Sequence, residues 1–161
     1  MVETTTNPEI ALLVEFLNTI DEDTGEEDLG DDRAFAAWLR QHGLPSRGAD
    51  ATEARAARDA LRAAADGRHP RQDVFAMVPL HLGINADANP ELTSRHPLGP
   101  ILVAALKLAY EGEWTRIKLC DMDSCRFAFH DTSRNRSGRW CTMRVCGNRA
   151  KTRAFRERQK S

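Results

Sequence analysis

The sequence lacks a signal peptide and any long apolar run. Its first residues carry neither the basic n-region nor the apolar h-region of a secretory signal, and no apolar stretch approaches the ~20 residues of a membrane span. We therefore expect a cytoplasmic protein that makes no membrane contact. Because thiols stay reduced in the cytoplasm, the four cysteines are expected to bind a metal rather than to form disulfides.

Residue patterns typical of catalysis are also missing. The five histidines include no HExxH pair, the serines lack the context of a nucleophile elbow, and no glycine run resembles a phosphate-binding loop. The acidic segment 21–32 is predicted to be an exposed loop. Its cluster of Glu26, Glu27 and Asp28 with Asp31 and Asp32 could bind a cation, but it lacks the alternating ligand spacing of a calcium loop, so we interpret it as solvated. As an alternative, it could cover the basic C-terminal end when nucleic acid is absent. The sequence thus predicts a protein that has no catalytic residues and is not an enzyme.

What is present is a globular composition with a sharply divided charge. Hydrophobic residues make up 41% and charged residues 29% of the 161 residues, which suits one compact domain with a small appended module. From Arg116 onward there are thirteen basic and four acidic residues, so this part carries about +9 and the preceding part about −10. We therefore predict a body over residues 1–115 and a basic module over residues 116–161 that faces nucleic acid.

The body is predicted to be mostly helical. Capping residues followed by helical periodicity indicate three helices, which begin after Asn7, after Asp31 or Asp32, and after Asp50. The periodicity of the first helix extends as far as Ile20. A fourth helix, over residues 101–110, is apolar nearly all round and is expected at the centre of the body.

Two further segments indicate strands, so the predicted fold class is α+β. Apolar residues alternate over 78–84, and the Asn- and Asp-rich segment 85–90 predicts a turn into a partner strand near 91–95, which makes one short β-hairpin. Residues 114–119 predict a short strand that leads into the first cysteine.

The cysteines form two close pairs with the same internal spacing. Four residues separate Cys120 from Cys125 and Cys141 from Cys146, and fifteen residues separate the pairs. Each pair can close a small knuckle, and four thiolates around one ion leave no open position for a substrate, which is typical of structural zinc. The alternatives are four unrelated cysteines, an iron–sulfur site, or ligation by His130, which we interpret as a loop or phosphate-contacting residue instead.

Basic side chains surround these knuckles and continue beyond them. The run 149–159 lacks Gly and Pro and predicts a helix, on which Arg149, Arg153, Arg156 and Lys160 share one narrow face. The loop between the knuckles and the second knuckle add Arg134, Arg136, Arg139 and Arg144. We expect these eight residues to contact nucleic acid, with a merely solvated helix end as the alternative.

Three segments resemble a known family. They are Cys120–Phe129, Asp131–Asn135 and Trp140–Lys151, and they are similar to the CGNR zinc finger, whose namesake motif is Cys146-Gly147-Asn148-Arg149. The segments Phe16–Thr19 and Trp38–Leu39, ahead of Gly43-Leu44, resemble the ABATE domain that usually precedes this finger. The resemblance implies a treble-clef-like zinc ribbon behind an α/β body, with the four cysteines as zinc ligands. It also implies a bacterial protein of a class described as stress-induced transcription regulators.

Three functions are therefore open at this point. The first is a DNA-binding transcription regulator whose body senses a signal or forms a homodimer. The second is a redox sensor in which oxidation of the zinc thiolates releases the metal. The third is an interaction module that binds RNA or an anionic protein.

Overall fold

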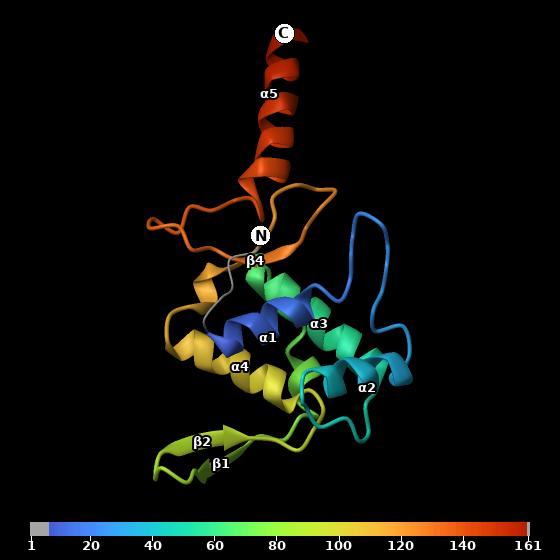
Figure 1. Ribbon diagram of the computed structural model, residues 1–161, viewed down its shortest axis with the longest axis vertical. Coiled ribbons are helices and arrows are strands. Elements are labelled where there is room, and N and C mark those ends of the chain that lie inside the picture. Colours follow the sequence, from blue (N-terminus) through green and yellow to red (C-terminus); the bar gives the residue numbers. More distant parts are fainter. Residues whose placement is uncertain (1–6, 161) are drawn as a thin grey trace.

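The computed structural model describes residues 7–160, except for the side chains of Gln72, Ala154, Glu157 and Lys160. Four helices and one β-hairpin form the packed part of the molecule, and a second hairpin and a fifth helix project from its opposite ends (Figure 1). The helices are α1 (Pro8–Leu17), α2 (Asp32–Gln41), α3 (Ala51–Ala65), α4 (Gly99–Tyr110) and α5 (Asn148–Lys160). The strands are β1 (His81–Ile84), β2 (Pro90–Thr93), β3 (Ile117–Leu119) and β4 (Ala128–His130). The predicted α+β class is confirmed.

The helix starts follow the predicted caps. Asn7 Oδ1 accepts from the backbone N–H groups of Glu9 and Ile10, at 2.9 and 3.3 Å. Asp31 and Asp50 cap α2 and α3 in the same way. These bonds satisfy amide donors that have no partner within the helix, so each cap residue fixes where its helix begins.

The first helix is shorter than its periodicity predicts. It ends at Leu17, and Ile20 instead forms an isolated antiparallel bridge with Glu27. Asn18 caps the C-terminus of α1, and its side chain bonds elsewhere in the fold. The periodicity of apolar residues overestimated the length of this helix, because it contains no information on the tertiary contacts of Asn18.

The hydrophobic core forms where α1 packs on α4 and α3. Leu13, Phe16 and Leu17 of α1 are fully buried, as are Ile101 and Leu108 of α4. The prediction that the apolar helix is central is therefore correct for this part of α4. Its last residue, Tyr110, points outward and is 84% exposed.

Two arginines of α3 are buried. The helical spacing of Ala54, Ala57, Leu61 and Ala64 predicts an inner stripe of alanine and leucine only. Arg58 donates to Glu27 Oε1 at 2.6 Å, and Arg62 pairs with Glu22. The acidic loop is thus not wholly solvated, because two of its carboxylates neutralise buried guanidinium groups of α3. Most of its other carboxylates remain exposed. The alternative that the acidic cluster covers the basic C-terminal helix is wrong for Glu27, which contacts α3.

The two hairpins have different environments. β1 and β2 pair antiparallel and project from the body at the end opposite α5 (Figure 1). β3 and β4 also pair antiparallel, and Ile117, Leu119 and Ala128 belong to the same buried cluster as α1 and α4. The strand predicted over 114–119 begins only at Ile117, because Trp114–Arg116 form a 3₁₀ turn.

Across residues 7–160, the helices are either too short or too polar to span a membrane.

Candidate metal centre

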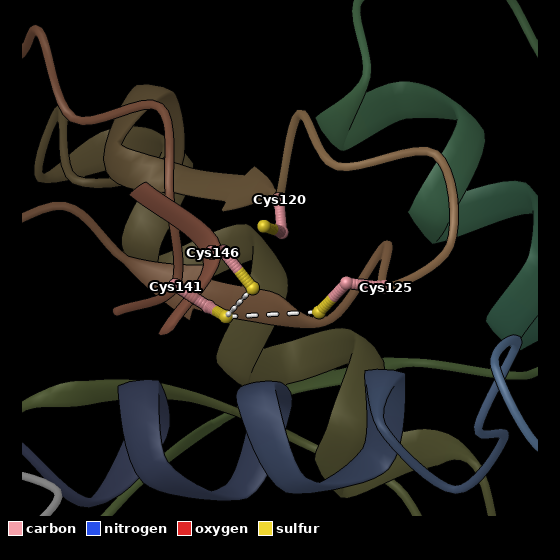
Figure 2. Close-up of side chains that lie close together, drawn as sticks. All are labelled: Cys120, Cys125, Cys141 and Cys146. Carbon is pink, nitrogen blue, oxygen red and sulfur yellow. Dashed lines mark hydrogen bonds between the residues drawn. The ribbon is translucent and has the colours of Figure 1, made fainter. Parts of the chain in front are cut away.

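Four cysteines from separate segments meet beside the body. Cys120 directly follows β3, and Cys125 closes a turn in which its N–H donates to the Met122 carbonyl at 2.8 Å. Cys141 follows the loop after β4, and Cys146 lies in a single π-helical turn, Met143–Gly147, that leads into α5. Figure 2 shows the four sulfur atoms gathered around one point.

The sulfur geometry fits one zinc ion. All four Sγ atoms lie within 4.8 Å of one another, and Cys141 Sγ is 3.7 Å from the Sγ atoms of both Cys125 and Cys146. A tetrahedral zinc with Zn–S bonds of about 2.3 Å requires sulfur–sulfur distances of about 3.8 Å. Four cysteine ligands complete the coordination shell, so the finger holds one structural zinc and the cofactor prediction is confirmed.

The environment of the thiols favours a cation between them. Burial raises the pKa of Cys146 to about 11, and burial together with neighbouring sulfurs raises the pKa of Cys141 further. Burial opposes ionisation of Cys120 as well, but hydrogen bonds from the backbone and from neighbouring cysteines outweigh it and lower the pKa of this thiol. Four thiolates this close repel one another, and a divalent cation removes the repulsion.

The side chains that cover the sulfurs differ from those predicted. Trp140 packs against the site as expected, together with Met122 and Ala150. The apolar residues of the finger sequence, Trp140, Phe127, Phe129 and Val145, predict a cover over the metal, but Phe127 and Val145 are 46% and 47% exposed. Phe127 is exposed because it precedes Ala128, whose side chain faces the core, and neighbouring residues of an extended chain point to opposite sides.

Gly147 serves close packing rather than a left-handed turn. Gly147 directly follows the last cysteine, where the sequence predicts a tight knuckle with positive φ. That prediction is wrong, since Gly147 continues the π-helical turn and is buried. A Cβ added here would lie 2.8 Å from Met143 Sδ and 3.2 Å from Trp140 Cδ1. Asn148 does bond the backbone of the turn as expected, because its Nδ2 donates to the Arg144 carbonyl at 3.0 Å.

His130 takes no part in the sulfur cluster. It lies on β4, where its Nε2 is 3.1 Å from Glu113 Oε2. The interpretation of His130 as a loop residue is therefore wrong, since it lies on a strand and its ring is paired with a carboxylate. A phosphate contact of His130 stays a prediction.

Hydrogen bonds fasten the finger to the body. Asn18 Nδ2 donates to the Ala128 carbonyl at 2.9 Å, and Ala128 N–H donates to Asn18 Oδ1 at 2.7 Å. Arg62 donates to the Arg126 carbonyl at 2.8 Å, and the Arg126 guanidinium pairs with Asp66 at 2.7 Å. Sequence reasoning missed these contacts, which join residues 60 or more positions apart.

The predicted basic residues separate into two groups. Arg144, Arg149, Arg153 and Arg156 border one hollow along α5. Arg134, Arg136 and Arg139 lie in the exposed loop between β4 and Cys141. In that loop Arg139 pairs with Asp121 and lies 5.1 Å from the centre of the Trp140 ring, while Arg136 donates to Thr115 Oγ1. The side chain of Lys160, the remaining predicted contact, lies outside the described residues.

Comparison with known families accounts for nearly the whole chain. The model of the CGNR zinc finger matches residues 116–159, and the ABATE model, described as "Putative stress-induced transcription regulator", matches residues 11–112. No curated protein matches the chain. Because the ABATE model covers well over half of the sequence, the chain belongs to the ABATE family, and it carries a zinc finger of the CGNR type.

Proposed function

We propose that this protein is a zinc-dependent DNA-binding transcription regulator and has no enzymatic activity. The observation that carries the proposal is the basic hollow along α5, bordered by Arg144, Arg149, Arg153 and Arg156. Arg153 Nη1 lies 3.8 Å from the exposed Asp123 Oδ2, a weak surface pair that leaves the hollow strongly basic. Guanidinium groups gathered at one hollow repel one another unless more anions lie between them, and the phosphates of a duplex supply regularly spaced anions.

The position of α5 supports binding to a large partner. The helix has 13 residues, and it projects away from the body (Figure 1). An isolated helix of this length is only marginally stable in water. A partner from outside the chain would therefore stabilise it, and the major groove of DNA is wide enough to admit a helix.

The zinc site would fix the base of this helix. Cys146 lies two residues before Asn148, where α5 begins. Cys146 belongs to the turn Met143–Gly147, whose start is capped by Thr142, because Thr142 Oγ1 accepts from Val145 N–H. With all four positions of the metal taken by thiolates, no position is left for a substrate, which supports a structural rather than a catalytic role.

The test is the salt dependence of binding to duplex DNA. We expect the double variant Arg153→Ala, Arg156→Ala to retain zinc, since both side chains are exposed and neither is a ligand. Each lost phosphate contact lowers the slope of log affinity against log salt by about 0.9, so the slope should fall by about 1–2. Fluorescence anisotropy with a labelled duplex at several salt concentrations measures this slope.

A matched control distinguishes the loss of phosphate contacts at α5 from a general effect of lower positive charge. The variant Arg33→Ala, Arg40→Ala removes the same charge from exposed positions on α2, away from α5 (Figure 1). It should leave the slope unchanged. If both double variants bind duplex DNA as the wild type does, the α5 proposal fails. If RNA of equal length competes better than the duplex, the interaction-module alternative replaces it.

A further inference from the structure

The β1–β2 hairpin exposes an unusual amount of apolar surface. Leu82 is 75% exposed and Ile84 is 68% exposed, and both lie on β1. Just before the strand, Met77 is 76% exposed. A two-stranded hairpin is at best marginally stable in water without further packing. The hairpin is also at the opposite end of the molecule from α5, so DNA bound at α5 would not cover it (Figure 1).

The outer edge of β1 is free to pair with another strand. Asn85 N–H donates to the Asn89 carbonyl at 2.9 Å, so Asn85 and Asn89 form a hydrogen-bonded pair at the end of the β1–β2 ladder. In an antiparallel ladder, hydrogen-bonded pairs alternate with pairs whose backbone groups point away from the partner strand. By that alternation His81 and Gly83 bond inward to β2, and the backbone N–H and C=O groups of Leu82 and Ile84 point outward.

Only the β1 edge is open in this hairpin. β2 contacts α4 and begins with Pro90, which has no N–H to donate. β1 contains no proline and no Asp, Glu, Lys or Arg, the residues with which proteins usually protect an exposed edge. An open, apolar and uncharged edge is suited to continue the sheet with a further strand.

We propose that β1 pairs antiparallel with β1 of a second copy of this chain. With the twofold axis at Gly83, Leu82 of one copy lies opposite Ile84 of the other. The two residues exchange two N–H···O=C hydrogen bonds, and the axis repeats this pair, so each outward N–H and C=O of Leu82 and Ile84 gains one partner. The product is a four-stranded antiparallel sheet. The second copy is the fitting partner because this edge is self-complementary in both hydrogen bonding and register, and no charges on the two strands repel each other.

Pairing would also remove apolar surface from water on both copies. In the paired register Leu82 and Ile84 lie side by side across the axis, and Leu92 is their neighbour on the same face, because it is the β2 partner of Leu82. The inference does not rest on DNA binding, since the α5 hollow and the β1 edge lie at opposite ends of the molecule (Figure 1).

The oligomeric state of the zinc-loaded full chain tests this proposal. Sedimentation velocity at increasing concentration should give twice the chain mass of 18.0 kDa. The variant Ile84→Lys, which places two like charges near the axis, should raise the dimer dissociation constant at least tenfold. The variant Tyr110→Lys is the control, because Tyr110 is a large side chain on α4 that is 84% exposed and lies outside the proposed interface, and it should dimerise as the wild type does.

Amide hydrogen exchange distinguishes strand pairing from nonspecific association. Exchange at Leu82 and Ile84 should slow as the concentration rises through the dimerisation range, while exchange in α5 should not change. Circular dichroism and zinc content verify that each variant is folded. A wild-type chain that stays monomeric at about 100 µM would overturn the proposal. So would equal weakening by Ile84→Lys and Tyr110→Lys, or a dimer in which the amides of Leu82 and Ile84 exchange at the monomer rate.

Discussion

Replacing Asn18 by alanine should loosen the finger from the body. The Asn18 side chain makes two hydrogen bonds to the backbone of Ala128, at 2.9 and 2.7 Å, and Ala128 is fully buried. Each such bond contributes about 0.5–1.5 kcal/mol net, and a buried group left without its partner costs a comparable amount. The variant should therefore lose about 1–3 kcal/mol of stability. For a chain of this size, the melting temperature should fall by about 2–4 °C per kcal/mol.

The assay is urea unfolding followed by far-UV circular dichroism. Zinc must be held at the same excess for every variant, because a ligand that binds only the folded state raises the apparent stability. The variant Asn135→Ala, in the exposed loop between the knuckles, is the control and should unfold at the wild-type midpoint. If Asn18→Ala has the midpoint and slope of the wild type, then these bonds do not hold the finger to the body.

Three further predictions concern the metal and a buried carboxylate. Metal analysis should find one zinc per chain. Chelation of the zinc should remove amide protection from residues 141–160, while β3 and β4 stay protected because they pack in the body core. Loss of protection in β3 and β4 would contradict this prediction. Asp131→Asn should destabilise the protein at pH 7. Burial opposes ionisation of Asp131, but its bonds from Lys118, Ser133 and Gly138 prevail and hold the pKa of this carboxyl well below its usual range. The stability it contributes is present above the unfolded pKa of about 3.9 and is lost as pH falls through the folded pKa. The difference in unfolding free energy between Asp131→Asn and the wild type should thus shrink below about pH 4. A constant difference from pH 7 to pH 3 would contradict the role of the ionised Asp131. Gly138→Ala should cost about 1–3 kcal/mol by overpacking, because its Cβ would lie 2.5 Å from Asp131 Oδ1. Gly30→Ala, with its nearest atom at 3.7 Å, should unfold like the wild type in the same denaturation assay.

The sequence alone determined the local structure and the identity of the metal site. Asn7, Asp31 and Asp50 set their helix starts because a cap bonds amides only two or three residues away. The cysteine spacing predicted the zinc for a similar reason, since each knuckle closes over four intervening residues and zinc imposes the same tetrahedral geometry on any four thiolates.

The tertiary structure decided how the finger and the body are joined. Periodicity extended the first helix past Asn18, and nothing near Asn18 in the sequence indicates that its amide pairs with a backbone 110 residues away. The burial of Arg58 and Arg62 has the same origin, because an arginine is tolerated in a core only where distant carboxylates and carbonyls pair with it. Such partners come together only when the chain folds, so composition and spacing could predict the zinc ligands but not the contacts that place the zinc finger against the body.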